Sequence, residues 1–182
     1  MKNIFKALLM ILLIHSFSYA DEYYIGKGEY SESIYISGKK AWYFVNECSF
    51  MLPIELALND KSPNLFNILS PKTLPEPDEK IHQLEITIIS SDSIKISNVG
   101  CNPHNRIFTK INPRYLTSKF NNLRLRSSPN TKSKIVSLLQ KGDKLIYLGS
   151  LVGEFVNENE GEWCFLITKE GTTGFSYRSF LE

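Results

Sequence analysis

The sequence is poor in the side chains that carry metal, cofactor and nucleotide chemistry. It has three histidines and three cysteines among 182 residues. After the first twenty residues only His82 and His104 remain, and neither has a cysteine or aspartate at the spacing of a metal site. No glycine-rich phosphate loop follows a strand-like segment. We therefore expect no metal, no cofactor and no bound nucleotide.

Long apolar runs are also lacking, except at the N-terminus. Residues 1–20 contain two lysines, then an apolar run over residues 7–14, and they end in the small residue Ala20. This order is typical of a secretory signal peptide. We therefore expect residues 1–20 to be removed and the protein to be exported, to the periplasm or beyond the cell. A retained membrane anchor is the alternative, but a spanning helix needs about 20 apolar residues, and His15 ends this run early.

Without the predicted signal peptide the chain has no net charge. Two of its 21 basic residues, Lys2 and Lys6, lie in that segment and none of its 19 acidic residues does, so 19 of each remain. Proteins that bind nucleic acid normally present a basic face, and the sequence has no dense cluster of lysine and arginine. We expect no nucleic-acid partner and, once the signal is removed, no membrane span.

The three cysteines are Cys48, Cys101 and Cys164. The first lies too far along the chain for a lipid-anchored N-terminal cysteine. In an oxidising compartment cysteines of one domain tend to pair, so we expect a Cys48–Cys101 disulfide. It would close a loop of about 54 residues and add about 4 kcal/mol to stability in the chain-entropy estimate. Cys164 stands between two aromatic residues in a strand-like run, and a buried free thiol is expected there.

Residues 21–105 have the pattern of a small β-rich domain, whose type the sequence does not identify. Residues 33–37 and 40–46 are rich in β-branched and aromatic residues and flank a glycine-lysine turn. In the first of these runs serine and tyrosine alternate with isoleucine, which predicts a strand with one buried face. A further β-branched run with a polar turn predicts a hairpin over residues 83–99.

Five prolines interrupt residues 50–78. Because proline removes a backbone donor and restricts the residue before it, we expect at most short helical turns, near residues 54–58 and 64–69, and then an extended loop. Residues 106–116, stiffened by Pro113, are expected to be a linker to a second domain.

Four pieces of the last third resemble, in order, the elements of the bacterial SH3 (SH3b) family. They are the opening Leu-x-Val-Arg-x-x-Pro signature, a hydrophobic pair before Lys-Gly and an alternating strand, a strand that begins with tryptophan, and a closing Gly-aromatic segment. The matching stretches are LRLRSSPN, KIVSLLQKGDKLIYLG, EWCFLI and TTGFSYRSFL. The residues independently favour a small β-barrel, because Leu123 and Leu125 share one strand face and Gly142 permits a tight turn. We therefore predict an SH3-like β-barrel over residues 117–182, in a mainly β protein.

The resemblance implies a binding module, typically for peptidoglycan peptides or for partner proteins. Peptide grooves on small barrels are lined by aromatic residues, so Trp163, Tyr147 and Tyr177 are the candidate ligand contacts, with packing in the barrel as the alternative. Arg126 either presents its guanidinium to a carboxylate or braces the neighbouring loop.

One stretch departs from the family pattern. Residues 148–162 are longer than the usual hairpin connection and contain four glutamates. The stretch is either a solvated insertion or a border of the ligand groove that favours a cationic partner.

The leading interpretation is an exported, non-catalytic module that binds cell wall peptidoglycan or an envelope partner protein, and not an enzyme. One alternative is an envelope cysteine peptidase that uses Cys48 and His104. It is weakened by Phe50, which stands where such enzymes have a glycine after the Cys-Ser pair. The other is a purely structural envelope protein.

Overall fold

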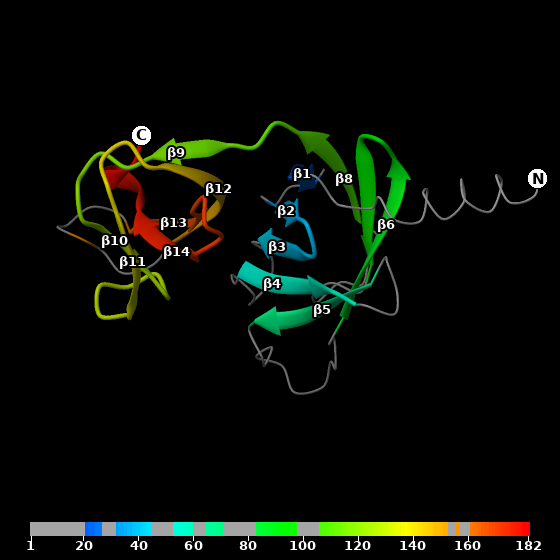
Figure 1. Ribbon diagram of the computed structural model, residues 1–182, viewed down its shortest axis with the longest axis horizontal. Helices are drawn as coiled ribbons and strands as arrows, with labels where there is room; N and C mark the ends of the chain where they lie inside the picture. Colours follow the sequence, from blue (N-terminus) through cyan, green and yellow to red (C-terminus); the bar gives the residue numbers. More distant parts are fainter. Residues whose placement is uncertain are drawn as a thin grey trace, which may run out of the picture.

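The computed structural model of the protein describes residues 21–26, 32–44, 53–59, 65–70, 83–97, 106–152, 156 and 161–182. The predicted signal peptide, residues 1–20, lies outside them. The described part consists of β-strands and one short 3-10 helix, which confirms the predicted mainly β fold. Its strands form a closed barrel and a six-stranded sheet, which stand side by side in Figure 1.

The N-terminal unit is a closed barrel of eight antiparallel strands. Each strand pairs with the next in sequence, and the last pairs with the first to close the barrel. Such an up-and-down order needs only hairpin connections. The strands are β1 (Glu22–Gly26), β2 (Ser33–Ser37), β3 (Lys40–Phe44), β4 (Pro53–Leu58), β5 (Leu65–Ser70), β6 (Gln83–Ser90), β7 (Ser93–Ser97) and β8 (Arg106–Ile111).

Side chains fill the interior of this barrel. Successive residues of a strand point to opposite faces, so every second residue points inward, and an eight-stranded barrel is just wide enough to be filled by them. The buried inner cluster comprises Tyr24, Ile34, Ile36, Ala41, Tyr43, Leu56, Phe66, Ile86, Ile94, Ile96 and Phe108.

Both predicted hairpins are present. β2 and β3 pair around a turn in which Gly38 has a φ of 56°, a left-handed conformation that glycine adopts without the steric cost of a Cβ. β6 and β7 pair around a turn at Ser91 and Asp92.

The helical turns predicted in the proline-containing segment are wrong. Residues 53–58 and 65–70 are the antiparallel strands β4 and β5. Pro53 is the first residue of β4, a position where a missing N–H is tolerated. Leu56 and Phe66 are buried in the barrel, so the strand neighbours on each side outweigh the local preference.

The segment expected to be a linker is mostly structured. Residues 106–111 are β8, which pairs with β7 and β1 and thereby completes the barrel. Tyr115–Thr117 is β9, a strand of the C-terminal sheet. Only three residues, including Pro113, therefore separate the two units.

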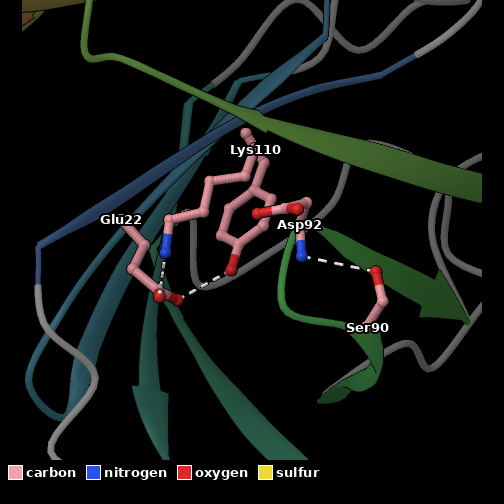
Figure 2. Close-up of polar contacts among 5 residues, drawn as sticks. Glu22, Ser90, Asp92 and Lys110 are labelled. Carbon is pink, nitrogen blue, oxygen red and sulfur yellow. Dashed lines mark hydrogen bonds and ion pairs between the residues drawn. The ribbon is translucent and has the colours of Figure 1, made fainter.

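Polar contacts join the strands that close the barrel (Figure 2). Lys110 Nζ on β8 donates to Glu22 Oε1 on β1 at 2.6 Å, and the Tyr24 hydroxyl donates to Glu22 Oε2 at 2.7 Å. The Lys110 backbone N–H also donates to the Asp92 carbonyl in the β6–β7 turn at 2.8 Å. A partly exposed ion pair contributes about 1 kcal/mol at most, so these contacts mainly fix the register of the closing strands.

The C-terminal unit is a six-stranded antiparallel sheet in the order β11-β10-β14-β13-β12-β9. Its strands are β10 (Leu123–Arg126), β11 (Ile135–Leu139), β12 (Lys144–Val152), β13 (Glu162–Ile167) and β14 (Thr173–Tyr177), with β9, and the 3-10 helix η1 spans Arg178–Phe180. Its own core comprises Leu125, Leu139, Leu145, Cys164, Leu166 and Leu181.

A third apolar cluster joins the two units. Tyr23, Tyr35, Trp42 and Phe44 point outward from β1–β3 and pack on the outer face of the C-terminal sheet. That face contributes Leu148, Leu151, Trp163, Phe165, Ile167, Phe175 and Tyr177. Consequently β2 is buried on both faces, whereas its alternating sequence predicted burial of one face only.

Two hydrogen bonds supplement this apolar contact. The Tyr23 hydroxyl donates to the Tyr147 carbonyl at 3.0 Å, and Ser33 Oγ donates to the Leu148 carbonyl at 2.5 Å. Both carbonyls lie at an irregularity of β12, where its register with β13 shifts between Tyr147 and Gly149. Burial raises the pKa of Tyr23, so its hydroxyl remains a donor well above neutral pH.

Candidate functional site

A groove of about 500 Å³ lies on the C-terminal unit, and one of its walls is a row of four aromatic rings. Trp163 on β13 and Tyr177 on β14 are direct cross-strand partners, with ring centroids 5.5 Å apart. Phe180 of η1 follows at 5.6 Å from Tyr177, and Phe120 at 6.0 Å from Phe180. The row therefore runs from the contact between the two units to the open surface.

Exposure rises along this row. Trp163 and Tyr177 are only 3% and 4% exposed because they also belong to the cluster between the two units. Phe120, at the other end, is 54% exposed. A large exposed aromatic side chain beside a groove can bury apolar area on binding without a loss of native packing.

The groove is also lined by polar residues from β10 and the turns beside it. The described ones include Asn121, Asn122, Arg124, Arg126 and Thr131. Alternation along β10 sends Leu125 into the core and Arg124 to the opposite face. Arg126 follows an irregularity in the strand register and lines the same groove.

Arg126 braces the loop that follows β10. Its Nη1 donates to the Ser133 carbonyl at 2.8 Å, and its side chain is largely buried. Within the loop, Ser133 Oγ donates to the Ser128 and Asn130 carbonyls, at 2.8 and 2.9 Å. These hydrogen bonds therefore brace the loop beside the groove.

Three of the four residues predicted to contact a ligand lie together in this groove. They are Trp163, Tyr177 and Arg126. Tyr147 is not among them: its hydroxyl contacts Ser150 Oγ at 3.3 Å and its ring lies 5.0 Å from the Arg114 guanidinium. Tyr147 packs against the core of the C-terminal unit. A role of these residues in ligand binding remains a prediction.

Sequence reasoning did not select Phe120 and Phe180, which complete the aromatic row. Phe180 is the third aromatic residue of the closing segment TTGFSYRSFL, so its place in that segment was a usable signal. Phe120 offered no such sequence signal, because it lies between strands. Its position follows from the turn at Asn121 and Asn122, where Asn122 has a φ of 57° and Asn121 Oδ1 accepts the Lys141 N–H at 3.0 Å.

The predicted buried thiol at Cys164 is confirmed. Cys164 is free and fully buried in the C-terminal core. Burial and the nearby Glu162 carboxylate raise its pKa to about 12. Since the thiolate is the reactive form, Cys164 is chemically inert in the folded protein.

Several predicted features lie outside the described residues. They are both members of the expected disulfide, Cys48 and Cys101, the histidine of the alternative catalytic pair, His104, and three of the four insertion glutamates, Glu154, Glu158 and Glu160. The fourth, Glu162, is an exposed residue at the start of β13. Within the described ranges no group of three or more histidine, cysteine or acidic side chains is placed to hold a metal ion. The same ranges contain no helix of the length and apolarity needed to cross a membrane.

Comparison with known families identifies the C-terminal unit. Residues 121–182 match the family described as bacterial SH3 domain, which confirms the resemblance seen in the sequence motifs. Comparisons with curated proteins and with solved structures found no match. The matched residues contain three of the four aromatic rings of the groove. The fourth, Phe120, directly precedes them.

Proposed function

We propose that this protein, whose residues 121–182 form a bacterial SH3 domain, is an exported, non-catalytic protein that binds cell wall peptidoglycan through the aromatic groove. Bacterial SH3 domains are binding modules that are commonly related to the cell wall. An envelope partner protein is the alternative ligand. The N-terminal barrel acts as a platform that packs on one side of the domain and leaves the groove accessible.

The observation that carries this proposal is the graded aromatic row. Two of its rings are anchored in the packed cluster between the units, so they form a rigid part of the groove lining. Phe120 remains exposed beside them. Rigid aromatic surfaces bind extended peptides at low cost in conformational entropy. The stem peptides of peptidoglycan are ligands of this shape.

Co-sedimentation with purified peptidoglycan tests the proposal. The wild-type protein is expected in the pellet, and Phe120→Ala should lower its affinity about tenfold, because burial of a large apolar side chain contributes about 1.5–3 kcal/mol. Ile107→Ala is the matched control: Ile107 is 52% exposed but lies on β8 of the barrel. Trp163→Ala is a poorer probe because it would also disrupt the packing between the two units.

The result can contradict the proposal in two ways. If the wild-type protein stays in the supernatant, peptidoglycan is not the ligand, and an envelope partner or a purely structural role is favoured. If Phe120→Ala and Ile107→Ala sediment like the wild type, binding occurs elsewhere on the protein and the groove is not the site.

A further inference from the structure

The described lining of the groove is positively charged, in a protein that is formally neutral beyond residue 20. Its described lining includes two arginines, Arg124 and Arg126, and no aspartate or glutamate. Both arginines come from β10, two residues apart. The register of β10 with β11 shifts between Leu125 and Arg126, and both arginine side chains line the same groove.

The two arginines differ in their freedom to bind a ligand. Arg126 is largely buried and already donates through Nη1 to the Ser133 carbonyl. Arg124 is exposed, and no ion pair or hydrogen bond joins its side chain to another described residue. Arg124 is thus the available charge at the rim, and Arg126 fixes the loop behind it.

The chemistry of the groove lining defines the kind of ligand that fits. A guanidinium presents a planar fork of donors that matches a carboxylate, and such charge-assisted pairs are stronger than neutral hydrogen bonds. The aromatic rings that line the same groove suit apolar side chains and the faces of peptide groups. A cationic ligand would meet like charge at β10.

We infer that the groove recognises the free terminal carboxylate of a short peptide, with Arg124 binding the carboxylate and the aromatic row holding the residues that precede it. This inference rests on the proposed function and deepens it, because it names the group that distinguishes one peptide from another. Peptidoglycan stem peptides and protein C-termini share this group, and the configuration of their last residues separates the two sources.

Fluorine NMR of the protein labelled with 5-fluorotryptophan is a direct test. The chain has two tryptophans. Trp163 lines the groove, whereas Trp42 lies in the cluster between the units and serves as an internal control. The probes are acetyl-Ala-D-Ala-D-Ala as the free acid, its C-terminal amide, and the all-L free acid.

The free acid should shift the Trp163 signal and leave the Trp42 signal in place. The amide should bind about 10- to 100-fold more weakly, the range expected for the loss of a hydrogen bond to a charged group. Arg124→Gln should reduce binding of the free acid to the level of the amide, and Arg124→Lys should restore part of it. Lys169→Gln removes the same charge from an exposed turn between β13 and β14 and should have no effect.

Each outcome bears on a separate claim. Equal binding of acid and amide would overturn carboxylate recognition while leaving the groove as a binding site. The Trp163 signal could fail to shift with any probe while the wild type still sediments with peptidoglycan. This result would overturn carboxylate recognition but would leave the proposed function standing. Failure in both assays would remove the proposed function as well. Preference for the D-configured acid over the all-L acid identifies the stem peptide as the source.

Discussion

Gly149 on β12 lies directly against Phe44 on β3 of the barrel, and its replacement should weaken the contact between the two units. A Cβ at Gly149 would lie 2.8 Å from Cζ of Phe44, and closer still to two other atoms of that ring. Phe44 is fully buried and stacks on Phe165 at 6.4 Å, so the ring has no free space in which to move. Gly149→Ala therefore forces β12 away from β3.

The cost has two parts. Overpacking a well-filled core costs about 1–3 kcal/mol. Displacing β12 also weakens the hydrogen bonds from Tyr23 and Ser33 to the two carbonyls beside Gly149, at about 1 kcal/mol each. We expect a loss of about 3 kcal/mol in the free energy of unfolding, and a fall of about 6–12 °C in the melting temperature for a chain of this size.

Urea denaturation of a double-mutant cycle with Phe44→Leu is the assay. The smaller side chain gives the new methyl group space, so the double variant should be more stable than the sum of the single effects predicts, by at least about 1 kcal/mol. Gly38→Ala is a useful comparison, because Gly38 has a positive φ but no atom within 4 Å of the place that a Cβ would occupy; it measures backbone strain alone. Additive effects of Gly149→Ala and Phe44→Leu would refute the steric argument.

The remaining predictions concern the cysteines and one buried tyrosine. Titration of the denatured, unreduced protein should find one free thiol, because Cys48 and Cys101 are predicted to be paired and Cys164 is free; three thiols would contradict the disulfide and favour the cysteine peptidase. Burial raises the pKa of Tyr35 from the ordinary 10 to about 12, so the neutral phenol is favoured in the folded state. The stability gained from the neutral Tyr35 phenol in the folded state is complete below pH 10 and is lost as the pH rises through 12. Urea unfolding at about pH 9 and about pH 11.5 should therefore show a smaller decline for Tyr35→Phe than for the wild type, and an equal decline would be evidence against this cause.

Local sequence patterns were sufficient to predict strands whose pairing partners lie close by in the chain. The β2–β3 and β6–β7 hairpins were predicted from alternating side chains and short turns, since both partners of each pair lie within a few residues. The SH3 motifs were sufficient for the C-terminal unit because each of them contains one or two of its strands, from β10 to β14. These are pairings in which the sequence pattern and the contact coincide.

Contacts between distant segments were not predictable in the same way. β4 and β5 lie in a proline-containing segment with weak strand signals, and they are strands because β3 and β6 flank them in a closing barrel. β8 falls in the segment that was expected to be a linker, and its partner β1 lies far earlier in the chain. In both places the tertiary environment outweighs the local preference.

The candidate site shows the same division. The sequence by itself determined that the C-terminal third is an SH3-type β unit and that Trp163, Tyr177 and Arg126 were candidates, because residue type and motif position carry that information. Only the tertiary structure decided that Tyr147 lies away from the groove, that Phe120 and Phe180 complete it, and that Trp163 is shared with the contact to the barrel. The physical reason is that a strand's sequence specifies which residues share a face, whereas the surface that covers that face belongs to another part of the chain.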